Sequence, residues 1–187
     1  MTAAPIDALL ATVGTHVIML SDVRMAQALG LVEGADLRAI LARLVDRSLM
    51  LAEVERFQPP QPASTRVAAA FETLRARIGA EAFAAALRTN GFDEPYIHSF
   101  VMDTLRLEAY LSQRFGALAD PSEEEVDAAM AARPTGESDD VLRARVRDQL
   151  RAARFSALVS QWVAELRTRN DVSIRPRSND LLTITHE

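Results

Sequence analysis

Three histidines carry the side chains of this sequence that most readily transfer protons or bind metal ions. They are His16, His98 and His186, and long stretches of sequence separate them. Their spacing does not match the paired histidines that a helical metal site requires. We therefore interpret all three as structural or solvent-exposed side chains, and we expect no metal site and no cofactor.

Two groups of charged residues are further candidates, one for a metal site and one for contact with an acidic partner. Acids gather at Glu123–Glu125 and Asp127, and arginines follow at positions 143, 145, 147, 151 and 154. Acids in the first turn of a helix are favoured by the helix dipole, which explains them without a metal. The arginines either contact an acidic partner or form the solvated face of a helix, partly offset by the preceding acids. Because the sequence also lacks cysteine and the recognised hydrolase, phosphate-loop and dinucleotide motifs, we expect no enzymatic activity and no catalytic residues.

The composition predicts a folded protein. Of the 187 residues, 49% are hydrophobic and 25% are charged, which excludes wholesale disorder. The net charge of -5 argues against a nucleic-acid partner, since such proteins usually carry a basic excess. No apolar run approaches the roughly 18 to 20 residues that cross a bilayer, so we expect peripheral membrane contact at most. Residues 1–10 do not resemble a signal peptide, although a leader removed before this start would leave no trace.

The order of predicted elements indicates a mainly α fold with a small sheet. A hairpin is expected over 6–20, helices over 22–134, and a short loop over 135–140. A long helix over 141–169 and a closing strand over 171–175 follow, and this strand would join the hairpin. These elements form one predicted domain, 1–176, and 177–187 are a tail.

Several helix ends can also be predicted. Ser21 and Asp22 are expected to cap a helix over 23–29, and Ser64 or Thr65 a later one. The helix that starts near Asp36 should reach about Phe57, the helix after Asp93 should carry a core stripe as far as Leu111, and Ser122 with Glu125 forms a capping box.

The arrangement of these segments resembles the SurA-like periplasmic chaperones, a family that includes SurA, PpiD and PrsA. The family's "V-N-x-x-V-I-x-x-S-D-V" opening is similar to residues 13–23, and its "F-x-x-x-L-x-x-x-G" element to residues 83–92. Its "ITDEEV" helix start is similar to residues 121–126. The family's last helix and closing strand resemble residues 162–167 and 172–174.

The resemblance implies a fold like the SurA N-terminal chaperone domain, with one departure. Relatives carry parvulin-type prolyl isomerase domains of about a hundred residues, whereas this sequence has only 135–140 at that point. The resemblance therefore implies an ATP-independent holdase without isomerase activity. It would act in the periplasm on apolar segments of unfolded exported or outer-membrane proteins. The alternative is a dedicated interaction subunit, or a homodimeric scaffold formed by segment exchange, that holds one specific partner.

A client-binding surface would use apolar side chains that do not pack in the core. On the helix after Pro95, the aromatic and leucine side chains at the flank of the core stripe are candidates, and methionines add adaptable apolar groups. Either these residues are buried against other helices, or they line a cleft for clients. The candidates are Tyr96, Met102, Leu107, Tyr110, Met50 and Met130.

Overall fold

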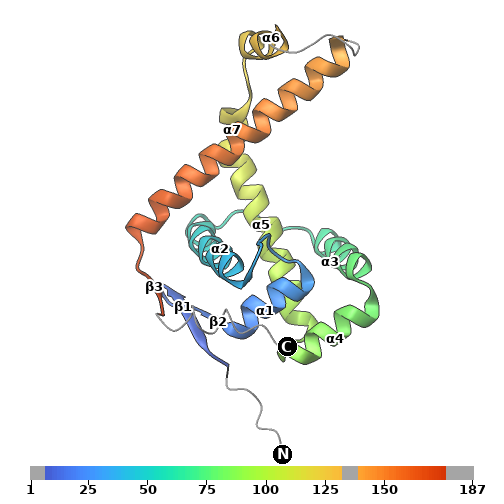
Figure 1. The fold of residues 1–187 in the computed structure, drawn as a ribbon, viewed down its shortest axis with the longest axis vertical. Coiled ribbons are helices and arrows are strands. Elements are labelled where there is room, and N and C mark those ends of the chain that lie inside the picture. Colours follow the sequence, from blue (N-terminus) through green and yellow to red (C-terminus); the bar gives the residue numbers. More distant parts are fainter. Residues whose placement is uncertain (1–6, 132–138, 176–187) are drawn as a thin grey trace, which may run out of the picture. The chain divides into compact units, whose positions relative to one another are not determined.

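The computed structural model describes residues 7–131 and 139–175. These residues form a mainly helical fold with a small three-stranded antiparallel sheet, as predicted (Figure 1). In chain order the elements are β1 (Leu9–Val13), β2 (His16–Met19), α1 (Leu20–Leu29), α2 (Leu37–Phe57), α3 (Ser64–Ile78), α4 (Ala80–Asn90), α5 (Glu94–Ala119), α6 (Glu123–Ala131), α7 (Asp139–Arg169) and β3 (Val172–Ile174).

The chain divides into two compact units. The described residues of 1–107 and 166–187 belong to unit 1, and those of 108–165 belong to unit 2. The single domain over 1–176 stays a prediction.

Strand β1 is the centre of the sheet, whose order is β2-β1-β3 (Figure 1). A two-residue turn at 14–15 joins β1 to β2, and Gly14 adopts a φ of 56°, which glycine tolerates without strain. Val13 lies opposite His16 on one side and opposite Val172 on the other. The predicted hairpin and closing strand are present in the described residues, with narrower bounds of 9–19 and 172–174.

A cluster of apolar side chains from four helices forms one core of unit 1. The rings of Phe71 and Phe83 meet edge to face at 5.7 Å between centroids. His98 stacks on Phe71 with centroids 3.9 Å apart, so its imidazole has a packing role. The buried members of this cluster are Met25, Leu29, Phe71, Phe83, Leu87, Ile97, Val101 and Leu105.

Two of the predicted helix starts are wrong. Helix α1 begins at Leu20, before the expected caps, because the Asp22 carboxylate reaches back to accept the Met19 N–H at 2.8 Å. Helix α3 begins at Ser64 itself and has no side-chain cap, so neither Ser64 nor Thr65 serves as one. The start of α2 is confirmed, since the Asp36 side chain accepts the Ala39 N–H at 2.8 Å.

The later boundaries also differ in part. Helix α5 continues to Ala119, beyond the predicted core stripe. Helix α7 begins at Asp139, so the last two positions of the predicted 135–140 loop are helical. The rest of that loop and the tail over 177–187, which contains His186, lie outside the described residues.

Unit 2 is held by aromatic packing and by ion pairs between α6 and α7. The Phe115 ring meets Phe155 and Trp162 edge to face, at 6.5 and 5.7 Å between centroids. The predicted capping box is present, with Ser122 N–H donating to Glu125 at 2.8 Å. The arginines of α7 at 143, 147, 151 and 154 pair with acids at 120, 123, 125 and 127. This agrees with the interpretation of a solvated helix face whose positive charge is partly offset by the preceding acids.

Candidate functional site

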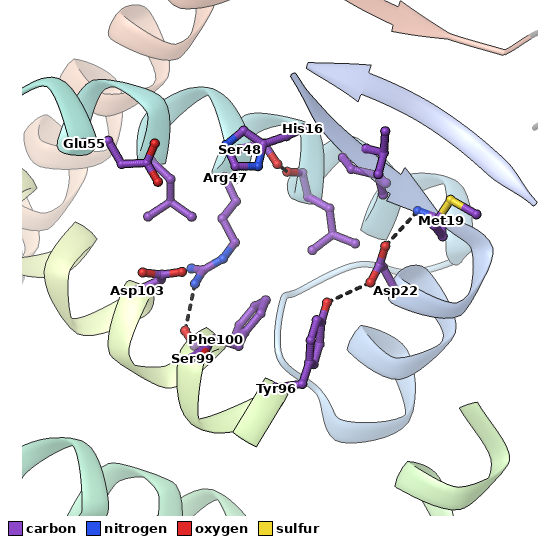
Figure 2. A pocket seen from close by; sticks show the side chains of 14 residues that line it. His16, Met19, Asp22, Arg47, Ser48, Glu55, Tyr96, Ser99, Phe100 and Asp103 are labelled. Atoms are coloured by element: carbon purple, nitrogen blue, oxygen red, sulfur yellow. Dashed lines mark hydrogen bonds between the residues drawn. The ribbon is translucent and has the colours of Figure 1, made fainter. Parts of the chain in front are cut away.

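A pocket of about 440 Å³ lies in unit 1 between β2, α2 and α5 (Figure 2). Strand β2 contributes all four of its residues, 16–19, and α1 contributes Asp22. Several lining side chains, including Val17 and Glu55, are exposed, so the pocket opens to solvent. Its volume falls in the range of about 300 to 1,000 Å³ that is typical of ligand sites.

The pocket combines apolar side chains with a few polar groups. Helix α2 contributes Leu44 and Leu51, and α5 contributes the ring of Phe100. Val17 and Tyr96, both exposed, add apolar surface at the opening. Such an arrangement provides hydrophobic contact area together with groups that can fix the orientation of a bound chain.

The outer edge of β2 carries main-chain groups that β1 does not use. Gly14 N–H donates to Asp171 and Arg175 N–H donates to Leu10, so the even-numbered residues of β1 bond to β3. Bonding alternates along an antiparallel strand, so Ala11 and Val13, on the turn side of the register shift in β1, bond to β2. Given the register, the N–H and C=O of Val17 therefore point away from β1. Within the described ranges no strand pairs with this edge.

A hydrogen-bond bridge fixes the end of β2. The Asp22 carboxylate accepts the Met19 N–H through one oxygen at 2.8 Å and the Tyr96 hydroxyl through the other at 2.7 Å (Figure 2). Burial, followed by the hydrogen bond to Asp22, raises the pKa of the Tyr96 phenol above its ordinary value. The phenol therefore stays protonated and donates. The bridge ties α5, α1 and β2 together beside the pocket.

Arg47 crosses the pocket from α2 to α5. Its guanidinium donates to the Phe100 carbonyl at 2.8 Å, and its Cζ lies 3.9 Å from the centroid of the Phe100 ring. The charge thus takes part in a cation–π contact as well as a hydrogen bond. Arg47 therefore joins two walls of the pocket.

The charge of the pocket lining is negative. The lining holds three acids, Asp22, Glu55 and Asp103, against the single Arg47, with His16 counted as neutral. Asp103 forms an ion pair with Arg106 at 3.1 Å. Glu55 is exposed, and among the residues that the structure describes it forms no ion pair. Glu55 is thus the acid best placed to meet a cation from solution.

Of the predicted client-binding residues, only Tyr96 lines this pocket. Leu107 and Tyr110 are each only 7% exposed, so of the two alternatives that the sequence left open, this pair follows the one in which the side chains are buried. Tyr110 packs instead against Trp162 with ring centroids 5.8 Å apart. The three candidate methionines, Met50, Met102 and Met130, are half-buried and outside the pocket.

Sequence reasoning missed Val17, Arg47 and Phe100. Val17 carried a usable signal, because successive strand residues point to opposite faces, which places Val17 on the face opposite the buried Ile18. Arg47 and Phe100 carried none, since each lies on a helix whose pattern does not show which neighbour it faces. Their contact depends on the packing of α2 against α5.

The described residues hold no group of three or more histidine, cysteine or acidic side chains that is placed to bind a metal ion. His16 lies at the pocket and His98 in the core cluster. The expectation of no metal and no cofactor stays a prediction.

Within the described part of the chain, no helix is both long and apolar enough to cross a membrane. No family model matches the sequence, and no curated protein matches it either.

Proposed function

We propose that this chain is an ATP-independent holdase chaperone that binds apolar segments of unfolded proteins. The observation that carries the proposal is the pocket beside the unpaired edge of β2, where apolar side chains and unused main-chain groups are exposed together. An unfolded segment offers both apolar side chains and unpaired main chain, so it can use both features.

The resemblance to SurA-like chaperones supports the cellular part of the proposal. The clients would be exported or outer-membrane proteins, and the chain would act in the periplasm without prolyl isomerase activity. Recovery of the native protein in a periplasmic fraction would support this location, and recovery in the cytosolic fraction alone would contradict it.

The first experiment is light scattering of a chemically unfolded outer-membrane protein that is diluted into buffer with and without equimolar chain. Suppressed aggregation without nucleotide is the expected result. A folded chain that suppresses nothing, but captures one partner tightly, would favour the dedicated interaction subunit instead.

The chain offers a matched pair of variants for this assay. Val17 is 59% exposed at the pocket, and Val141 is 55% exposed in unit 2. Val17→Asp places a charge at the proposed site and should weaken suppression, whereas Val141→Asp should leave it unchanged. Equal effects of both substitutions would contradict this placement of the binding site.

A further inference from the structure

We infer that a client binds as an added strand along the outer edge of β2, with a large apolar side chain in the pocket and a lysine or arginine beside Glu55. This inference rests on the proposed function and adds the binding geometry and the kind of segment selected. The partner is an extended, apolar and locally basic polypeptide segment.

Val17 offers the main-chain groups that an added strand would bond. Its N–H and C=O point away from β1, as the register of the sheet requires, and its side chain is exposed. The next outward N–H, that of Met19, is already bonded to Asp22. The edge therefore offers a complete donor and acceptor pair at Val17 and ends at Met19. A short edge of this kind binds an extended segment in one register.

The pocket next to that edge can receive client side chains. Alternate residues of an added strand point to the same face, so one set of client side chains turns towards the pocket. Leu44, Leu51 and the Phe100 ring are among the residues that receive it. A volume of about 440 Å³ suits one or two large apolar side chains rather than a folded surface.

The charge of the lining selects the flanking residue. Asp22 and Asp103 already have partners, Tyr96 and Arg106, and the Arg47 guanidinium is engaged with Phe100. Figure 2 shows Glu55 and Asp103 at the end of the pocket away from Met19. A basic side chain beyond the anchored apolar residue would therefore meet net negative charge. An acidic side chain there would be repelled.

The test uses a fluorescein-labelled peptide with one phenylalanine and, two positions on, one lysine in a serine and threonine background. Binding is followed by fluorescence anisotropy. N-methylation of one backbone amide should weaken binding by about fivefold or more, the loss expected for one hydrogen bond. N-methylation of the adjacent amide, which faces away from β2, should change it less than about twofold. Equal and small effects at both amides would overturn the proposal.

Substitutions in the protein, at Val17 and Glu55, test the same geometry. Val17→Pro removes the outward N–H but no hydrogen bond to β1, so β2 stays paired, and Val17→Thr is the control that keeps the donor. Glu55→Lys should weaken the lysine peptide and strengthen a peptide with glutamate at that position. Glu81→Lys, an exposed substitution of the same kind on α4, should change neither peptide. The N-methylated peptides need only the unaltered chain, so poor folding of Val17→Pro would not block the test.

The outcomes separate this inference from the proposed function. Aggregation suppression that is the same in Val17→Pro and Val17→Thr would leave the holdase in place and overturn the strand-addition geometry. Alternating N-methyl effects without any suppression would support the geometry and contradict the holdase. A change in the oligomeric state of Val17→Pro, without a change in peptide affinity, would show that a second copy occupies the edge and would overturn the inference.

Discussion

Removal of the Tyr96 hydroxyl tests the bridge that fixes the end of β2. Tyr96→Phe deletes the donor to Asp22, which lies at 2.7 Å, and leaves the ring in place against Phe92, 4.2 Å away between centroids. A hydrogen bond to a charged group contributes about 1.5–3 kcal/mol when it is well buried. Tyr96 is 37% exposed, so water replaces part of that bond and we expect a loss of about 1 kcal/mol.

Urea unfolding followed by circular dichroism measures this loss of free energy. In thermal unfolding, the melting temperature should fall by roughly 2–4 °C for a chain of this size. Asp22→Asn completes a double-mutant cycle, in which the two substitutions should be coupled by about 1 kcal/mol. If Tyr96→Phe is as stable as the parent, and the effect of Asp22→Asn is the same in both backgrounds, the reasoning is refuted.

The pH dependence gives a second check on the same bridge. The pKa of Tyr96 is raised in the folded chain, whereas an unfolded tyrosine titrates near pH 10. The stability that depends on the protonated phenol is therefore complete below about pH 10 and is lost as the pH rises towards the folded pKa. The difference in stability between the parent and Tyr96→Phe should narrow above that pH. A constant difference would contradict the raised pKa.

Three further predictions concern the cores and unit 2. Phe83→Ala, at a side chain 1% exposed, should lower the free energy of unfolding by about 3–5 kcal/mol in urea titrations, and a loss below about 1 kcal/mol would contradict its place in the core. Leu107→Ser and Tyr110→Ser should each lower the free energy of unfolding by roughly 3 kcal/mol or more in the same titrations, because each places a serine where an apolar side chain is buried. Near-parent stability would instead favour the alternative in which these side chains line a cleft. The hydrogen bond from Ser122 and the contact with Arg154 lower the pKa of Glu125, so its stabilising effect is present above the ordinary glutamate pKa and is lost as the pH falls through the lowered value. The parent and Glu125→Gln should therefore differ in melting temperature near neutral pH and converge in acid, and a difference unchanged by pH would exclude this role.

The sequence was most informative where local chemistry decides the structure. The two short apolar runs on either side of the turn at Gly14 predicted the hairpin, and Asp36 predicted the start of α2, because both depend on neighbours within a few residues. The predicted start of α1 was wrong, and the cause again lies within a few residues. Asp22 was expected to precede the helix, but it acts from inside the first turn and caps Met19.

The candidate site could not be read from local patterns. Tyr96 and Leu107 both lie at the flank of the same helical stripe, yet the structure leaves the first exposed and buries the second. A helical period gives the direction of a side chain about its own axis but not the element that covers it. The pocket also requires three segments, around Val17, Arg47 and Phe100, that are distant in the sequence.

The central position of β1 has a consequence for the order in which the protein can form during synthesis. β1 leaves the ribosome before unit 2, whereas its partner β3 and the buried Leu166 come after the whole of unit 2. Until Val172 emerges, the β1 edge opposite β2 has no partner, and unit 1 remains incomplete while 108–165 are made. Unit 2 is contiguous and can fold first, so the nascent chain exposes an unfinished sheet for much of its synthesis.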